Sequence, residues 1–315
     1  MVKTFTTNTF SNVYKDDYDE DKGFQRILFN SQKALQAREL TQLQTIIQEG
    51  INRFGKNVFK EGAAVSAGGV AINNRYRFIK LDITLNPLPA TSIVGKSFVG
   101  QTSGITVKVL EVVPQVSPDP ATIYVQYINT LTATSGTSTI AVTPGEELVE
   151  TDGQIRLVVQ PINSTTNPAF GYGTKFSAGD QDFFTQGFFI HAPLQEIIIS
   201  KYSDIVSKTI GFKVLQDIVT VDDDNTLYDN QGSLPNHTAP GADRFRIRLI
   251  LTTKDLILDG ETFVYVASVV NSQIEERVTG FDQYNLINDL MATRTNDESG
   301  DYTVKPFFIR FEDSA

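Results

Sequence analysis

The amino-acid sequence changes once from a helix-forming pattern to a strand-forming pattern, and that change limits the folds that the chain can adopt. Between about Ser31 and Phe54 there is no proline and strong helix formers dominate. Beyond Gly62, glycine, proline and asparagine separate short runs of β-branched and aromatic residues. We therefore expect a mainly β protein with an N-terminal α-helix: a β-sandwich-like body that carries a small inserted β-barrel, plus a short C-terminal helix.

The same signals divide the chain into parts. The charged stretch from Tyr14 to Gly23 is unsuited to a core strand, so the N-terminus is expected to form an extended, solvated arm. Gly95, Gly100 and Gly104 space short strands in a region small enough to be an insertion. The predicted parts are an arm over 1–30, a coiled-coil-like helix over 31–55, a main β-rich domain over 56–90 and 151–315, and an inserted β domain over 91–150.

Two later segments have clear patterns. From Arg244 to Thr252, apolar residues alternate with three arginines, which predicts a strand with one face in a core. A helix is expected from about Gln283 to Arg294, followed by a terminal strand at Thr303 to Phe311.

The predicted first helix carries an apolar seam. Its residues are spaced 3, 4, 3 and 4 apart, as the a and d positions of a coiled coil are: Leu40, Leu43, Ile47, Gly50 and Phe54. Glu49 and Arg53 are placed to pair across one turn, and Gly55 is expected to end the helix in the left-handed conformation. The seam is about two heptads long. It either joins copies of the chain or packs on the chain's own β domain, and the pattern leaves both open.

Composition excludes several classes of function. With 27 basic and 37 acidic residues the net charge is −10, which disfavours nucleic acid as a partner. The absence of cysteine removes disulfides, thiolate nucleophiles and cysteine-ligated zinc, and two histidines leave no spare imidazole ligands. The N-terminus lacks an apolar signal region, and no apolar run is long enough for a membrane span. We expect a soluble protein with no membrane insertion.

No catalytic, metal or cofactor site is predicted. The acidic run Asp222–Asn225 lacks the spacing of a calcium loop, which favours a solvated loop. His191 and His237 have no nucleophile context and are expected to be structural. One candidate anionic-ligand face remains, on Arg244, Arg246 and Arg248, whose guanidinium groups could bind phosphate or an acidic glycan. The alternative is that they pair with carboxylates of a neighbouring strand.

Four stretches, spread from residue 26 to residue 307, carry a resemblance: Arg26–Phe29 with Leu35–Gln44 and Arg53–Gly55; Thr91–Gln126; Leu227–Ser233 with Asn236 and Ala239–Arg244; and Arg294–Thr295 with Asp297–Phe307. Together they resemble a family of tailed-phage virion proteins, the DUF4815-type baseplate or tail-fibre proteins of myoviruses, including those of cyanobacteria. In those relatives an aromatic residue is usual where this chain has His237. They generally continue past the equivalent of Phe307 into fibre or receptor-binding modules, so this chain is expected to be the anchoring portion.

The resemblance implies a non-enzymatic structural protein of a contractile tail, located in the virion and synthesised in the bacterial cytoplasm. It implies a homotrimer in which the seam residues bundle around a threefold axis, with baseplate wedge and tail-fibre proteins as further partners. The arm would lie along a neighbouring baseplate protein and order only on assembly; its partner-binding residues would be Tyr14, Asp17, Tyr18 and Phe24. The alternatives are a carbohydrate-binding or depolymerising host-adsorption protein, which would bind a surface glycan, and an assembly factor absent from the finished particle.

Overall fold

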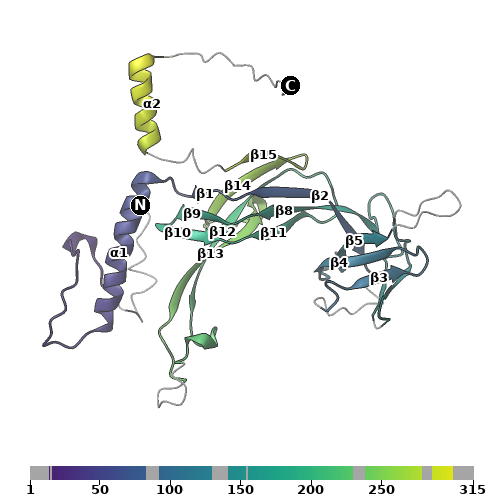
Figure 1. Ribbon diagram of the computed structural model, residues 1–315, viewed down its shortest axis with the longest axis horizontal. Helices are drawn as coiled ribbons and strands as arrows, with labels where there is room; N and C mark the ends of the chain where they lie inside the picture. The colour runs from purple at the N-terminus through teal and green to yellow at the C-terminus, as the bar shows by residue number, and fades with distance from the viewer. Residues whose placement is uncertain are drawn as a thin grey trace, which may run out of the picture. The chain divides into compact units, whose positions relative to one another are not determined.

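The computed structural model describes residues 14, 16–82, 92–129, 141–153, 155–229, 238–278 and 286–300 (Figure 1). Within these residues the chain forms three antiparallel sheets and two α-helices, which confirms the mainly β fold class. The chain divides into two compact units: unit 1 holds Met1–Ala67, Gln181–Ala192 and Thr279–Ala315, and unit 2 holds Gly68–Asp180 and Pro193–Val278. The predicted domain boundaries stay a prediction.

Unit 1 combines a small sheet with both helices. The sheet has the order β1-β9-β10 and is antiparallel throughout. The helix α1 contacts β10 and also contacts α2. The elements are η1 (Glu20–Lys22), α1 (Ala37–Val58), β1 (Ala63–Ser66), β9 (Gln181–Thr185), β10 (Phe188–Ala192) and α2 (Leu286–Ser299).

The helix α1 begins and ends later than predicted. It begins at Ala37 because the Glu39 carboxylate accepts a hydrogen bond from the Gln36 backbone N–H at 3.0 Å, which caps the first turn. Gly55 does not end the helix, so that prediction is wrong. Gly55 lies within the last turns, where a Cβ atom would overlap the ring of Phe184. This glycine allows α1 to approach the β9–β10 hairpin closely, and the helix ends where the Phe59 N–H donates to the Gly55 carbonyl at 2.7 Å.

The C-terminal helix α2 is longer than the predicted helix over 283–294. Its Leu290 and Met291 side chains are exposed. The terminal strand predicted at 303–311 lies outside the described residues. No helix in the described part of the chain has the length and hydropathy that a membrane span requires.

Unit 2 is built on one long sheet with the order β11-β8-β2-β5-β4-β3-β6-β7. One apolar cluster of this sheet includes Phe98, Ile105, Ile123 and Leu157, all fully buried. The strands are β2 (Val70–Lys80), β3 (Ser97–Gly100), β4 (Thr106–Val113), β5 (Thr122–Asn129), β6 (Glu147–Glu150), β7 (Arg156–Val158), β8 (Phe170–Ala178) and β11 (Gln195–Ser200).

The strands of the predicted inserted barrel belong to this long sheet. Strand β5 pairs with β2 of the host, so the insertion continues the host sheet and has no separate sheet of its own. At the far end, Asp82 N–H donates to the Val158 carbonyl and Gln160 N–H donates to the Lys80 carbonyl, both at 2.9 Å. These bonds bring the last strand back to the end of β2. The insertion therefore shares its core with the host strands, as its small size requires.

A second sheet in unit 2 has the order β13-β12-β14-β15. Its strands are β12 (Lys208–Val219), β13 (Arg244–Thr253), β14 (Phe263–Val270) and β15 (Gln273–Arg277). The strand predicted over 244–252 is therefore confirmed, one residue longer. Strands β12 and β13 pair over their length and extend beyond β14 and β15 as a two-stranded ribbon (Figure 1).

Candidate functional site

The predicted seam residues lie on one side of α1, and that side is exposed. The exposed fractions are 44% for Leu40, 58% for Ile47 and 65% for Phe54. Leu43 is partly buried, and a Cβ atom at Gly50 would meet nothing within 4 Å. Ile51, which the sequence prediction missed although it lies beside this seam on a helical wheel, is also 40% exposed. We call these six residues the outer stripe.

The opposite side of α1 faces its own unit, and it is polar. At about 100° per residue, Thr45, Gln48 and Asn52 lie roughly opposite the outer stripe. Gln48 Nε2 donates to the Gly187 carbonyl at 2.7 Å, in the turn between β9 and β10. Asn52 is buried against the same glycine and donates from Nδ2 to the buried Glu49 carboxylate at 3.1 Å. A helix that packs on its own domain normally turns its apolar side inward. In α1 the apolar outer stripe is exposed and the polar side faces the unit, which is the reverse of that arrangement.

The arm also contacts the polar side of α1. Thr45 Oγ1 donates to the buried Asp16 carboxylate. Arg53 Nη2 donates to Glu20 Oε1 at 2.8 Å and to the Tyr18 hydroxyl at 3.3 Å. Tyr18 is 8% exposed, and its burial raises the pKa of its hydroxyl against the opposing charge of Arg53. The expected solvated arm is therefore wrong for Asp16 and Tyr18.

One smaller prediction on the helix is wrong. Arg53 forms its ion pair with Glu20 of the arm in place of the predicted Glu49. The nonlocal position of Glu20 explains the error, because a sequence pattern at one turn's spacing reports only pairs within the helix. Tyr14 has an interaction within the chain, and its predicted role in partner binding stays a prediction.

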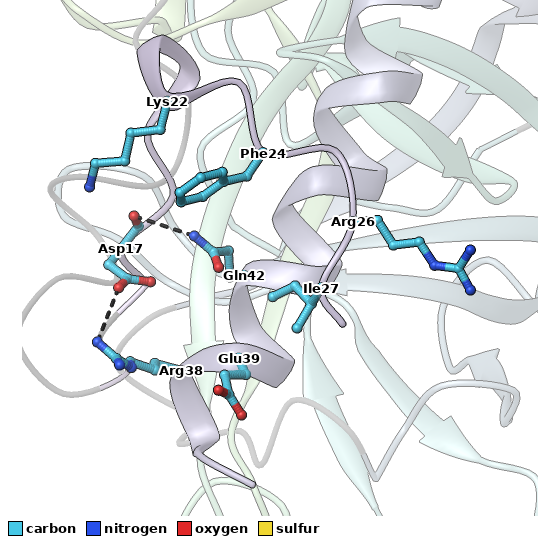
Figure 2. Close-up of a pocket in the computed structure, with 8 residues that line it drawn as sticks. All are labelled: Asp17, Lys22, Phe24, Arg26, Ile27, Arg38, Glu39 and Gln42. Atoms are coloured by element: carbon cyan, nitrogen blue, oxygen red, sulfur yellow. Dashed lines mark hydrogen bonds and ion pairs between the residues drawn. The ribbon is translucent and has the colours of Figure 1, made fainter. Parts of the chain in front are cut away.

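A shallow pocket of about 340 Å³ lies between the arm and the first turns of α1 (Figure 2). Arg38 Nη1 donates to Asp17 Oδ2 at 3.4 Å, and Gln42 Nε2 donates to the Asp17 carbonyl at 3.5 Å. Phe24 lies at the pocket and is 52% exposed, whereas the Arg26 side chain points away from Asp17. The lining residues are Asp17, Lys22, Phe24, Arg26, Ile27, Arg38, Glu39 and Gln42. The pocket is thus closed on its inner side by contacts that join the arm to the helix.

Heptad positions separate the contacts within the chain from the outer stripe. With Leu40 at position a, the stripe occupies a, d and one e position, which form the interface of a coiled coil. The contacts made by Gln42, Thr45, Gln48 and Asn52 fall on b, c and f positions, which lie outside such an interface. Arg53, which donates to Glu20 and to Tyr18 of the arm, occupies a g position at the edge of such an interface. Most of the contacts made by α1 side chains therefore lie on the side that a helical bundle would leave free.

The three arginines of the candidate anionic-ligand face lie on β13, and two of them, Arg246 and Arg248, form ion pairs. Arg246 donates from Nε and Nη2 to the two oxygens of Asp217, at 3.0 and 2.6 Å. Arg248 Nη2 donates to the same carboxylate at 3.0 Å. Asp217 lies on β12 directly opposite Arg246 in the register, and Arg244 donates to the Ala242 carbonyl at 2.6 Å. The described structure thus has the carboxylate pairing that was the alternative to a ligand site.

A pH titration tests this ion-pair cluster. The hydrogen bonds from Arg246, aided by its charge and by Arg248, hold the pKa of Asp217 below its ordinary value of 3.8. Because the pKa is lowered in the folded state, the stabilisation is present at neutral pH and is lost as the pH falls through that lowered pKa. We expect Arg246→Gln to raise the Asp217 pKa toward 3.8, as measured by NMR of the carboxyl carbon. Arg244→Gln is the control, and an equal shift in that variant would contradict the assignment.

The remaining candidates have structural contacts. His191 Nδ1 lies 2.9 Å from Asp182 Oδ1, and Ser66 Oγ donates to Asp182 Oδ2 at 2.6 Å. The carboxylate thus separates the hydroxyl from the imidazole, the reverse of what a nucleophilic serine needs. Asp223 accepts from the Thr220 backbone and hydroxyl, and Asp224 caps the turn η2 (Asn225–Leu227). His237 lies outside the described residues, within which no group of three or more His, Asp or Glu side chains is placed to hold a metal.

Comparison with known proteins gives one match. The family described as "Domain of unknown function (DUF4815)" matches residues 12–84 and 198–315, which is more than half of the chain. Three of the four stretches that carry the resemblance lie inside these segments, and the stretch 91–126 falls between them. The matched residues include α1, the arm from residue 12 and the β12–β13 ribbon. No curated protein and no solved structure matches the chain.

Proposed function

We propose that this chain, which belongs to the DUF4815 family, is a non-enzymatic structural protein of a contractile phage tail. In this proposal it is a homotrimeric baseplate or tail-fibre component that anchors a fibre to the baseplate. The resemblance to tailed-phage virion proteins supports the location. The observation that carries the proposal is the outer stripe of α1, an apolar coiled-coil seam that faces away from the elements that hold the helix.

The outer stripe has a size that favours assembly only at high local concentration. Full burial of one Leu, Ile or Phe side chain contributes about 1.5–3 kcal/mol. The stripe offers a few such side chains per copy, whereas association costs on the order of 4–15 kcal/mol in lost translational and rotational freedom. Helix packing alone is therefore expected to give a reversible trimer, which neighbouring subunits of a baseplate would stabilise further.

The arm supplies a second contact surface in this proposal. Since Asp16, Asp17, Tyr18 and Glu20 contact α1 of the same chain, we assign the partner-binding part to residues further along the arm. Phe24, Leu28 and Phe29 are 52%, 81% and 54% exposed. An exposed apolar group of this kind is typical of a protein-binding segment. We assign it to a neighbouring baseplate wedge or tail-fibre protein.

Light scattering on the purified chain tests the trimer. We expect a mass near three times 34.9 kDa at high micromolar concentration. The double variant Leu40→Asp/Ile47→Asp puts two charges into the outer stripe, and it is expected to run as one chain while its far-UV circular dichroism stays unchanged. Burial of an unpaired carboxylate in a helix interface is strongly unfavourable, which is the reason for the large effect.

The matched control makes the same two substitutions away from α1. Ile205 and Leu256 are 67% and 64% exposed, so Ile205→Asp/Leu256→Asp adds equal charge at comparable exposure. This control should keep the wild-type mass. A folded wild-type monomer at high micromolar concentration would remove autonomous trimerisation. Absence of the chain from purified virions, measured by mass spectrometry of tail fractions, would overturn the structural role itself and favour an assembly factor.

A further inference from the structure

We infer that a second copy of this chain covers the outer stripe, with the Phe54 ring of one copy inserted at Gly50 of the next. The inference rests on the proposed self-association and adds the packing that determines which copies fit. It concerns one turn of α1, in which a residue without a side chain is followed four positions later by the most exposed large apolar side chain of the helix.

The side-chain-free position at Gly50 has no explanation within the described chain. Glycine in a helix interior is less favourable than alanine by about 1 kcal/mol. At Gly55 this loss of helix stability is offset, because the missing side chain allows close packing against Phe184. At Gly50 no such packing exists, since a Cβ there would meet nothing within 4 Å. Gly50 lies in mid-helix without a positive φ, so no turn requires it either. What remains is a hollow on the outer stripe, which we call the Gly50 hollow.

Phe54 has the size to fill such a hollow but does not fill its own. Side chains on a helix lean toward the turn that precedes them, which directs a residue at position 54 toward position 50. Nevertheless no atom of Phe54 lies within 4 Å of the Cβ position at Gly50, and the residue is 65% exposed. The ring is therefore free to enter a neighbouring surface.

Parallel helices around a threefold axis bring these two features together. In a parallel coiled coil, a side chain at position a enters a hole formed by four residues of the facing helix. For Phe54 those four are the neighbour's residues 50, 53, 54 and 57. A missing side chain at one corner gives room for an aromatic ring, which is larger than the usual Leu, Ile or Val. The other corners are held in place, since Arg53 donates to Glu20 and Asn57 Nδ2 donates to the Arg53 carbonyl at 2.8 Å.

The stripe favours a second copy over an unrelated partner because it is complementary to itself. The ring and the hollow lie on the same helix, and each copy offers both. The outer stripe contains no charged residue, so it offers no charge pattern for a partner of opposite sign. Thr45 and Gln48 contact the arm and the β9–β10 hairpin from positions off the stripe. Helix α2 also contacts α1, yet four of the stripe side chains stay exposed: Leu40, Ile47, Ile51 and Phe54.

A size-exchange experiment tests the packing by light scattering over a concentration series. Gly50→Leu puts a side chain into the Gly50 hollow, where the Phe54 ring of the neighbouring copy is placed. It is expected to raise the protein concentration at which half of the trimer dissociates at least tenfold, although leucine is a better helix former than glycine. Phe54→Ala leaves a cavity and is expected to weaken the trimer as well. The double variant Gly50→Leu/Phe54→Ala is expected to associate more tightly than either single variant. Lys56→Leu, on an exposed helix position off the stripe, is the control and should match the wild type.

The outcomes separate the packing from the proposed function. A Gly50→Leu chain that associates like the wild type would overturn the inference, as would a double variant no tighter than the weaker single variant. A wild-type trimer that survives Leu40→Asp/Ile47→Asp would also overturn it, since another surface would then join the copies. Detection of the chain in purified virions would leave the structural role standing in each of these cases.

Discussion

Replacement of Glu146 by alanine is expected to lower the free energy of unfolding of unit 2 by about 3–5 kcal/mol. The Glu146 side chain is 4% exposed, and its carboxylate accepts backbone N–H bonds from Thr102 at 3.1 Å, Ser103 at 2.9 Å and Thr143 at 2.6 Å. It also accepts the Ser103 hydroxyl at 3.0 Å. Alanine would leave the donors of Thr102 and Ser103 in the turn between β3 and β4, and the Thr143 N–H in the turn before β6, without this partner. Each unsatisfied buried donor costs about 1–3 kcal/mol.

The adjacent residue provides the control. Glu147 pairs with Arg156 at 3.1 Å on the surface, where an ion pair contributes about 0–1 kcal/mol. Urea unfolding followed by circular dichroism, with hydrogen exchange of the β3–β4 peptides, measures both variants. A Glu146→Ala variant that loses no more stability than Glu147→Ala would show that the buried carboxylate does not hold this turn.

The same substitution at two glycines of α1 is expected to have opposite effects. Gly55→Ala would place a methyl group in the Phe184 ring, and relief of that overlap is expected to destabilise unit 1 by about 1–3 kcal/mol. Gly50→Ala meets open space and is expected to stabilise the monomeric helix by roughly 0.5–1 kcal/mol through helix propensity. The expected difference between the variants is therefore about 1.5–4 kcal/mol.

Hydrogen exchange of α1 at low protein concentration measures this difference without interference from association. Protection should fall across α1 and the β9–β10 hairpin in Gly55→Ala and rise in Gly50→Ala. Equal protection in both variants would mean that the hairpin moves away from α1 without loss of stability. That result would contradict the packing of Phe184 in the hairpin against Phe59, whose ring centroids are 6.1 Å apart.

Local patterns predicted what depends on neighbours along the chain. The Pro-free stretch located α1, the seam spacing identified its apolar side, and the alternation around Arg246 located β13 with its salt-bridged face. These features follow from the helical and strand periods, which any stretch of sequence reveals. The family match rests on similar stretches and therefore agrees with them.

Contacts between distant segments account for the errors. Gly55 resembles a helix-ending glycine, but Phe184 lies far along the chain and has no local signature. Arg53 pairs with Glu20 in place of Glu49 for the same reason. The pairing of β2 with β5, which joins the predicted insertion to the host sheet, likewise has no local signature. The sequence also could not predict that the polar side of α1 faces its own unit. A seam shows which side of a helix is apolar, but it does not show which side the domain covers.

The construction of unit 1 from separated segments has a consequence for biosynthesis. The ribosome completes α1 early, but the β9–β10 hairpin that contacts it emerges only after β8 has been made. At elongation rates of up to about 20 residues per second, several seconds pass between the two. During this interval the helix lacks the partner of Gln48 and Asn52, so its final orientation is not yet set. If copies join through α1 as proposed, each chain is expected to fix its own helix only after the hairpin has emerged.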